Sequence, residues 1–463
     1  MVRRSLALLL LLCSGCPDDP VPVPVPTDAA TEAEDGTDVL AEDTDGADPG
    51  EPLADDGPPP SKDQCTKKWT YLFNEGGAPV SPIVAKDGVA TITAAGIIRR
   101  IATDGTHLGD CPDGFKAAPG ELFGSPAQDK DGTTFVGTTK GVLYAITGKC
   151  QKRWQKTVIA GVAIRAAPAL SQEADGPALF VLDDRPVLTK CTDEGGEAIC
   201  LEENFKLPEG DLPLAGAAPA IAVGDSPFVA FASRKRVTAV KLSMAKKWQF
   251  NEFTSKPGDK REITSTLALE ADGKVLFAAG EPVLNTYDNN MLYRLERDSQ
   301  DTQAVVDDGY PKPIEDLPKD TVTAIVVGTN HSLYLATLGH GILKLDPDGH
   351  ELWRFIGDDV SLHVSAVPAI GDDGALYYTA EPKHFYAVDD GGHRIFHYEM
   401  NVQGDIASKL ASTSPAIRGD GTVLVHIGTE LLAYACPSKG IATSSWPRYQ
   451  RNNRASGNLG ESE

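Results

Sequence analysis

The stretch from Ser125 to Trp154 reads SPAQDKDGTTFVGTTKGVLYAITGKCQKRW. Three short runs rich in β-branched and aromatic residues are separated by Asp-Gly, Lys-Gly and Thr-Gly turns, and the stretch ends on a tryptophan. This pattern predicts one four-stranded antiparallel unit. Such a unit has two apolar faces and too small a core to fold alone, so we expect copies that stack on one another.

Copies of the unit recur along the chain, each marked by a small residue that precedes a proline. Two further copies, around Thr266 and Ala324, lack the proline, and the eight anchors lie 42 to 58 residues apart, the length of a propeller blade. Because proline cannot donate to a sheet, we place the anchors on the innermost strand of each blade, beside the central channel. The proline-bearing anchors are Ser81-Pro82, Ser125-Pro126, Ala167-Pro168, Ala218-Pro219, Val367-Pro368 and Ser414-Pro415.

The fold class predicted from these repeats is all-β: an eight-bladed β-propeller of four-stranded antiparallel blades over residues 64–463. The 45 glycines and 33 prolines among 463 residues, without a long helical period, fit many short strands and turns. Aromatic residues mark the fourth strands of several blades, namely Trp154, Trp248, Trp353 and, by substitution, Phe396.

Ring closure is predicted to join the two ends of the chain. Lys67 to Phe73 (KKWTYLF) has a fourth-strand pattern without preceding strands, whereas Ser414 to Cys436 has three strands and no fourth. We therefore expect the first segment to complete the last blade, which removes two exposed sheet edges. The tail, Ser444 to Asn458, then lies against the outer edge of blade eight. The alternative makes this tail the fourth strand and displaces Trp69.

At Gly341 to Phe355 (GILKLDPDGHELWRF) and Gly141 to Trp154 the chain resembles the quinoprotein-like, or PQQ-like, propeller family. The resemblance covers about residues 65 to 460 and concerns blade packing rather than function. It implies that one tryptophan per blade docks on the next blade, although blades three and five lack it. In general plan the chain resembles the propeller lipoproteins of the outer-membrane barrel-assembly machinery. The implied docking residues are Trp69, Trp154, Trp248 and Trp353.

The N-terminus is typical of a secretory signal over residues 1–16. Arg3 and Arg4 precede a leucine run that is too short to span a bilayer, and Cys13-Ser14-Gly15-Cys16 follows. This end resembles the lipobox of bacterial lipoproteins, which implies cleavage before Cys16 and lipidation of its thiol. Cys13 departs from the usual aliphatic residue, and the alternative is an ordinary cleaved signal. We expect an exported protein anchored by lipid to the bacterial envelope at the outer membrane, on its periplasmic face or at the surface.

Residues 17–63 are predicted to be a disordered acidic linker. From Pro17 to Pro60 there are fourteen Asp and Glu residues, a VPVPVP run and no Lys or Arg. The formal net charge of the chain is −23. Nucleic acid and a bare anionic membrane are therefore poor partners, and membrane attachment is expected through the lipid only.

Six cysteines remain after the signal, an even number in an exported chain, and they allow fifteen pairings. Alignment of the repeats places Cys191 and Cys200 on either side of one hairpin turn of blade three. It places Cys436 and Cys65 at the equivalent positions of the strand pair that closes the ring. The third pair follows only by exclusion. The expected disulfides are Cys191–Cys200, Cys65–Cys436 and Cys111–Cys150.

No residue pattern predicts catalysis, a metal site or a cofactor. Quinoprotein dehydrogenases hold their quinone over adjacent cysteines, and no two cysteines are adjacent here. Asp129 to Gly132 begins like a calcium loop but lacks the terminal glutamate, and a tight turn is the better interpretation. The nine histidines show no zinc-ligand spacing. Arg418-Gly419-Asp420 invites an adhesion reading, yet it occupies the recurrent turn between first and second strands.

The predicted function is a non-catalytic, membrane-anchored scaffold that is monomeric and binds an envelope protein of unknown identity. The candidate binding loop is an irregular insertion between blades five and six, Asn285 to Asp320, whose aromatic and proline residues suit recognition. Lys256 to Glu262 is a second candidate loop. The alternatives are a quinoprotein dehydrogenase-like enzyme and a surface carbohydrate-binding or adhesion module. The candidate binding residues are Tyr287, Tyr293, Tyr310 and Lys312.

Overall fold

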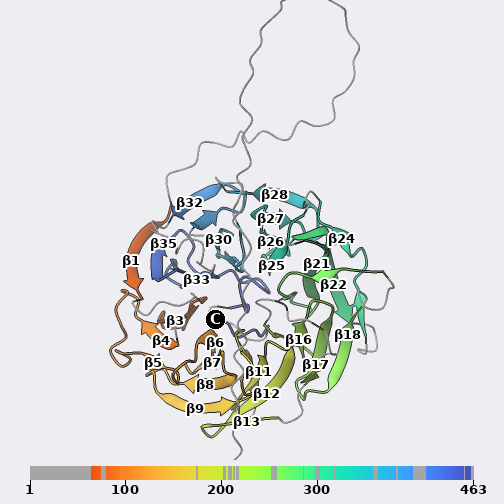
Figure 1. The fold of residues 1–463 in the computed structure, drawn as a ribbon. Coiled ribbons are helices and arrows are strands. Elements are labelled where there is room, and N and C mark those ends of the chain that lie inside the picture. The colour runs from red at the N-terminus through yellow and green to blue at the C-terminus, as the bar shows by residue number, and fades with distance from the viewer. Residues whose placement is uncertain are drawn as a thin grey trace, which may run out of the picture. The chain divides into compact units, whose positions relative to one another are not determined.

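Short strands form eight antiparallel sheets around a central axis in the computed structural model (Figure 1). This confirms the predicted eight-bladed β-propeller. The predicted signal, Cys16 and the acidic linker lie outside the described residues. The structure describes residues 64–459 except 74–79, 95, 174–175, 202–204, 207–210, 212–213, 215–217, 252–257, 285, 298–302, 316, 318, 358–362, 382–383, 400–412 and 453.

The first four blades follow one another along the chain, and each runs from the axis outward. Blade one is β2 (Ile83–Val84), β3 (Ala90–Ala94), β4 (Ile97–Ile101) and β5 (Phe115–Lys116). Blade two is β6 (Phe123–Gln128), β7 (Thr134–Thr138), β8 (Val142–Ile146) and β9 (Lys152–Thr157). Blade three is β10 (Ala169–Glu173), β11 (Gly176–Leu182), β12 (Val187–Glu194) and the outer pair β13 (Glu197–Cys200) and β14 (Phe205–Lys206). Blade four is β15 (Ala220–Ala222), β16 (Phe228–Ala232), β17 (Val237–Lys241) and β18 (Lys246–Phe250).

The remaining four blades close the circle. Blade five is the inner pair β19 (Glu262–Ile263) and β20 (Ala268–Leu269), then β21 (Val275–Val283), β22 (Thr286–Arg297) and the outer pair β23 (Ala304–Val306) and β24 (Lys312–Pro313). Blade six is β25 (Val322–Val327), β26 (Leu333–Thr337), β27 (Ile342–Leu345) and β28 (Glu351–Phe355). Blade seven is β29 (Ala369–Ile370), β30 (Leu376–Ala380), β31 (His384–Val388) and β32 (Arg394–Glu399). Blade eight is β33 (Ala416–Ile417), β34 (Thr422–Ile427), β35 (Glu430–Ala435) and β1 (Thr66–Leu72).

The burial of a strand depends on its distance from the axis. All five residues of β7 and of β30 are buried, because each blade is packed between two neighbours and covers both faces of its inner strands. The outer strand β9 is exposed except for Trp154. The apolar clusters lie between blades: one joins Phe135 and Trp154 of blade two to Leu179 of blade three. Apolar burial between blades therefore drives the stacking.

The anchor prolines lie where the predicted inner strands begin. Pro126 is inside β6, beside an irregularity in its pairing. The other five, Pro82, Pro168, Pro219, Pro368 and Pro415, directly precede the inner strands of their blades, where no ladder N–H is required. Small residues here let neighbouring blades approach closely: the Ser125 N–H donates to the Arg165 carbonyl (2.8 Å), and the Ser414 N–H donates to Ser81 Oγ (2.9 Å).

Blade five corrects the prediction of an irregular insertion at Asn285 to Asp320. Nearly half of that range is sheet, since β22 pairs with β21 and carries β23 and β24 on its outer side. The sequence hid this strand because its first half, Thr286 to Asn290, is polar and does not alternate. The range therefore supplies the third and fourth strands of blade five rather than a loop between blades.

The ring closes through β1, as predicted. β1 pairs antiparallel with β35, and Trp69 lies opposite Ala433. Cys65 and Cys436 form a disulfide at the same end of this pair, with their Cα atoms 4.3 Å apart. One sheet thus contains both ends of the propeller, which leaves no gap in the ring.

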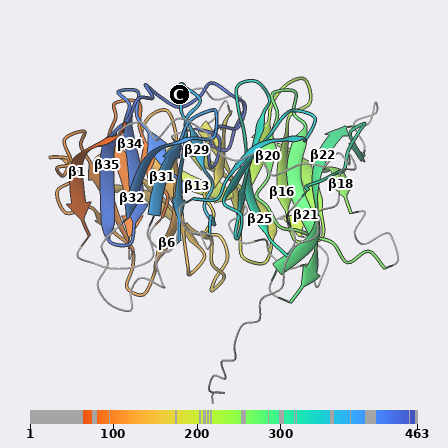
Figure 2. The same ribbon diagram turned by 90° about the horizontal axis from the view of Figure 1, so that it is seen from above.

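The C-terminal tail is neither on the outer edge of blade eight nor its fourth strand, so both predicted placements are wrong. Residues 441–459, which we call the axial segment, run across the axis at one end of the ring, where the C-terminus lies in Figures 1 and 2. Inner strands have an edge that no strand of their own blade covers, and the tail pairs with it. Five inner-strand residues donate their backbone N–H to a carbonyl oxygen of the axial segment. The donor and acceptor pairs are Gln128 and Arg454 (2.9 Å), Leu170 and Ser456 (2.8 Å), Ile221 and Gly457 (2.6 Å), Val327 and Trp446 (2.9 Å), and Ile370 and Pro447 (2.9 Å).

Candidate functional site

The β21–β22 hairpin of blade five is the longest in the ring. Beyond a shift in register after Ala279 the two strands continue to pair as far as Val283 and Thr286. In Figure 2 this hairpin reaches past the end of the ring opposite the C-terminus. Leu284 lies at its tip with a fully exposed side chain (100%) and a φ of 57°. A leucine in the left-handed region is uncommon, and such backbone strain gathers at functional positions.

The base of this hairpin is held firmly. Asn290 is buried, and its Nδ2 donates to the carbonyl oxygens of Leu317 (3.4 Å) and Asp320 (3.1 Å). Tyr287 forms a backbone bridge with Asp320 and donates its hydroxyl to Glu262 Oε2 (3.1 Å). Burial and the nearby Glu262 raise the pKa of Tyr287. The tip is therefore presented on a fixed support, which lowers the entropy lost when a partner binds.

Tyr293 corrects the predicted binding set, because it is a core residue. It is 2% exposed, and its ring stacks on Phe277 with centroids 5.1 Å apart. Its hydroxyl accepts a hydrogen bond from Arg261 Nη1 (3.0 Å). Alternation along β22 turns this side chain into the blade interface, which the sequence could not reveal without the strand register.

Tyr310 and Lys312 join blade five to blade six and do not form an open patch with Tyr287. The Arg294 guanidinium lies 4.5 Å from the centre of the Tyr310 ring, and the Tyr310 hydroxyl donates to the Pro347 carbonyl (3.1 Å). Lys312 is in β24, with Nζ 5.7 Å from the same ring. Both side chains are partly buried and have structural contacts. The feature that the sequence missed is Leu284, because a lone leucine beside Asn285 carries no pattern.

The second candidate loop, Lys256 to Glu262, is only partly among the described residues. In its described part, the carbonyl oxygens of Lys260 and Arg261 accept hydrogen bonds from Lys235 Nζ (3.3 and 3.0 Å). Glu262 faces Arg234 (3.4 Å) and Tyr287. This segment therefore supports the β21–β22 hairpin from the side of blade four.

Trp69 links blade eight to blade one. Its Nε1 donates to the Thr103 carbonyl (3.0 Å) in the turn between the third and fourth strands of blade one. Gly105 of the same turn has a φ of 87°, and a Cβ at this position would lie 2.6 Å from the indole. Glycine is required here both for the left-handed backbone and for the close approach of the ring.

Trp353 links blade six to blade seven in the same way. Its Nε1 donates to the Asp390 carbonyl (2.9 Å), and Gly392 lies against its ring. The Asp390 carboxylate accepts hydrogen bonds from Lys344 Nζ (2.6 Å) and the Tyr334 hydroxyl (2.9 Å). Burial alone raises the pKa of Asp390, but these donors lower it below its usual value overall. Burial and Asp390 together raise the pKa of Tyr334.

Trp154 and Trp248 lie in apolar clusters between blades. Trp154 is 6% exposed and Trp248 is 2% exposed. Each indole has an alanine opposite it on the third strand, at Ala145 and Ala239. The small alanine leaves room for the indole at these two positions.

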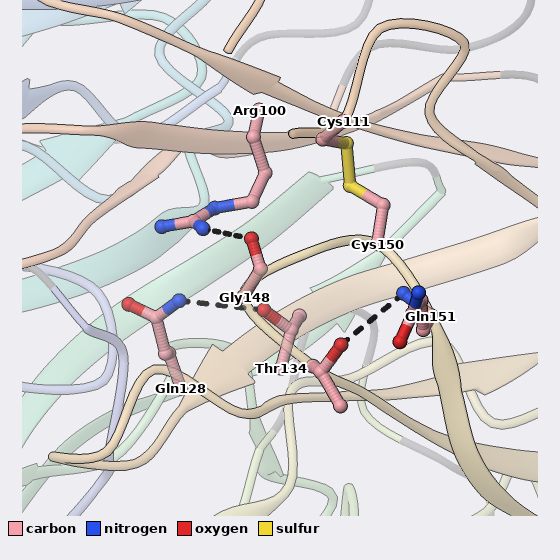
Figure 3. The surroundings of a disulfide bond; sticks show 8 residues. Arg100, Cys111, Gln128, Thr134, Gly148, Cys150 and Gln151 are labelled. Atoms are coloured by element: carbon pink, nitrogen blue, oxygen red, sulfur yellow. Dashed lines mark hydrogen bonds between the residues drawn. A yellow bond between two sulfur atoms is a disulfide. The ribbon is translucent and has the colours of Figure 1, made fainter. Parts of the chain in front are cut away.

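Three disulfides join the six cysteines of the propeller in the pairs expected from the sequence. Cys111–Cys150 ties blade one to blade two, with Cα atoms 5.3 Å apart, and Cys191–Cys200 spans the β12–β13 hairpin at 3.9 Å. Figure 3 shows the first of these beside Arg100, whose guanidinium donates to the Gly148 carbonyl. The junction of blades one and two is thus both covalent and hydrogen-bonded.

Aspartates in the turns act as hydrogen-bond acceptors for the backbone. The Asp129 carboxylate accepts the N–H groups of Asp131 (2.9 Å) and Thr133 (2.8 Å), and burial raises its pKa. Among the described residues there is no group of three or more His, Cys, Asp or Glu side chains that could hold a metal ion. Over the same residues, no helix is long and apolar enough to cross a membrane.

Arg418 is buried (2% exposed) and its guanidinium donates to the Ala102 and Thr103 carbonyl oxygens (3.4 and 3.2 Å). Burial lowers its pKa. Asp420 caps the turn by accepting the Thr422 N–H (2.9 Å). Arg418 therefore joins blade eight to blade one, while Asp420 stabilises its own turn, as the turn interpretation requires.

The described residues thus form a closed β-propeller with a projecting hairpin and a covered axial end. No protein-family model and no curated protein matches the sequence. Among solved structures, BamB from Moraxella catarrhalis is similar at a TM-score of 0.57 and 13% identity, over 80% of this chain and 99% of that one. The C-terminal WD40 domain of Sif2 is also similar, with a TM-score of 0.56 and 10% identity over 82% of this chain and 100% of that one. The Dos1 propeller is similar too, with a TM-score of 0.57 and 12% identity over 82% of this chain and 97% of that one. At these identities the likeness shows the fold alone.

Proposed function

We propose that this chain is an exported, lipid-anchored propeller that serves as a non-catalytic, protein-binding or assembly scaffold in the bacterial envelope. Three disulfides support an oxidising compartment, since such bonds are rare in the cytosol. The signal-like residues 1–16, with lipidation at Cys16, and a linker over residues 17–63 would tether the propeller at the outer membrane. The turn-docked indoles of Trp69 and Trp353 support its assignment to the PQQ-like repeat family.

The observation that carries the binding role is the leucine at the tip of the β21–β22 hairpin. Leu284 combines full exposure with a left-handed backbone, and both features oppose stability in the free protein. The hairpin below it is fixed by Asn290 and Tyr287. We therefore assign the tip as an apolar anchor that enters a pocket of a protein partner, where burial of the side chain offsets its exposure in the free state.

Site-specific cross-linking tests this role. A photoreactive benzoylphenylalanine replaces Leu284 in cells, and affinity capture from membranes is followed by mass spectrometry. We expect one dominant envelope-protein adduct. Leu284→Asp should reduce recovery of that protein at least ten-fold without lowering the melting temperature, because an exposed side chain contributes little to folding.

The matched control places the same cross-linker at Leu352, which is 55% exposed on the outer strand β28. The proposal requires that the adduct be specific to the hairpin tip. Identical adducts at both positions, or full recovery of the partner by Leu284→Asp, would contradict it.

A further inference from the structure

Blade two concentrates positive charge in a chain whose net charge is −23. From Gly132 to Gln172 there is no Asp or Glu, whereas the same run contains six basic residues. These are Lys140, Lys149, Lys152, Arg153, Lys156 and Arg165.

Two of the six basic residues are used inside the ring. Arg153 pairs with Asp193 of blade three (3.1 Å), and Arg165 pairs with Asp184 of the same blade. The other four are exposed lysines, and no carboxylate of the described residues lies within ion-pair distance of them. We call this set, Lys140, Lys149, Lys152 and Lys156, the lysine wall.

The fold arranges the lysine wall along the outer side of blade two. Lys152 and Lys156 belong to β9, the outermost strand of that sheet, which is exposed at every position except Trp154. Lys149 lies in the turn before β9, and Lys140 lies in the turn before β8. At about 3.3 Å per residue, β9 spreads these charges over roughly 20 Å.

The neighbouring charges at one end of the wall are known. Asp110 and Asp113 flank Cys111, which the disulfide holds beside Cys150. Opposite them, Arg100 donates to the Gly148 carbonyl next to Lys149, as Figure 3 shows. Arg100 therefore adds a positive charge near this end of β9, whereas β13 of blade three, the strand next to β9, adds the negative charge of Glu197.

We propose that the lysine wall binds an extended acidic polypeptide segment along β9. The charges are complementary, and the outer edge of β9 has backbone groups that pair with no other backbone group among the described residues. Salt screens charges beyond about 10 Å, so a narrow chain close to the wall is attracted. A flat anionic membrane or a long nucleic acid would also meet the acidic remainder and be repelled.

The competing role for these lysines is protection of an exposed edge strand from pairing with other chains. Blade four provides the comparison, because Lys246 lies opposite Val240 just as Lys152 lies opposite Ile146. Lys241 and Lys246 are exposed there as well. The two blades therefore allow equal changes of charge, at one equivalent position (Lys246 for Lys152) and at one further exposed lysine, Lys241 at the end of β17.

The probe is a fluorescein-labelled peptide of six Glu-Thr repeats, with six Gln-Thr repeats as the neutral peptide, and binding is measured by fluorescence anisotropy at 20 and 200 mM NaCl. We expect Lys152→Glu/Lys156→Glu to weaken binding of the acidic peptide at least ten-fold. The blade-four double variant, Lys241→Glu/Lys246→Glu, should change it less than three-fold. Lys152→Gln/Lys156→Gln, which adds no new charge, should lose affinity in the same direction. Thermal melts of all variants verify folding.

An acidic peptide N-methylated at alternate residues tests the strand pairing, and we expect it to bind at least five-fold more weakly than the unmodified peptide. Equal loss in both double variants, or no binding of the acidic peptide, would overturn the proposal and leave the lysines as edge protection. Binding to phosphatidylglycerol vesicles without binding to the peptide would overturn it in favour of a membrane surface. None of these readouts involves Leu284, so failure here is distinct from failure of the scaffold function.

Discussion

His426 makes the stability of this propeller depend on pH. It lies in β34 with a buried ring (1% exposed), and Nδ1 is 3.0 Å from the Val80 carbonyl oxygen. Burial lowers its pKa to about 4, although the Val80 carbonyl acts in the opposite direction. The His426 ring therefore takes up a proton near pH 6.5 in the unfolded chain but stays neutral at that pH in the folded chain. Stability from this group is complete above pH 6.5 and is lost as the pH falls toward 4, by about 3 kcal/mol.

Replacement of the ring tests this pH dependence. His426→Gln should lower stability at pH 7.5, yet the gap to the natural protein should narrow by about 3 kcal/mol between pH 7 and pH 4. Chemical denaturation of both proteins at each pH measures the gap. Parallel curves for the natural protein and His426→Gln would contradict the assignment.

Single residues also show where sequence reasoning succeeds and where it stops. The fourth-strand tryptophans were predictable, because they follow from the spacing of the repeat. Tyr293 was not, since a tyrosine in a polar strand is buried or exposed according to a register that the sequence does not reveal. Leu284 was not either, because its exposure depends on how far a hairpin extends beyond the ring.

The axial segment should stabilise the ring far more than its lack of regular structure implies. Five inner-strand N–H groups donate to its carbonyls, and Trp446 is 3% exposed. At about 1 kcal/mol per bond, deletion of residues 441–463 should cost at least about 5 kcal/mol. Addition of a synthetic peptide of residues 437–463 should restore the melting temperature and the hydrogen-exchange protection of Leu170 and Ile221. Truncation without a change in melting temperature would contradict this role.

Strands were predictable from the sequence where apolar residues alternate or form short runs between glycine turns. The axial segment escaped because it pairs with several blades in turn and so carries no periodicity of its own. Sequence reasoning assigned it to the outer edge of blade eight, where the blade has an obvious free strand. The inner edges offered better partners, since they are buried and their N–H groups otherwise lack acceptors.

For the whole ring, blade number and closure were predictable because both depend on counting. Eight anchors required eight sheets, and a lone first strand together with a last blade that lacks its fourth strand required a shared blade. The distribution of charge over the outer strands was harder to predict from the sequence. The lysine wall unites residues from two turns and one strand, and its exposure becomes clear only when β9 is known to be outermost.

The closing disulfide offers the sharpest test of the ring as a cooperative body. Cys65–Cys436 joins residues 371 apart in sequence, whereas Cys191–Cys200 spans only 9. Because a crosslink restricts the unfolded chain more when its loop is longer, the chain-entropy treatment gives about 6 kcal/mol for the first and about 3 kcal/mol for the second. Cys65→Ser/Cys436→Ser should therefore lower the free energy of unfolding about twice as much as Cys191→Ser/Cys200→Ser, with the other disulfides intact. Denaturation with hydrogen exchange at β1 and β35 measures this, and equal losses would mean that strand pairing alone holds the ring shut.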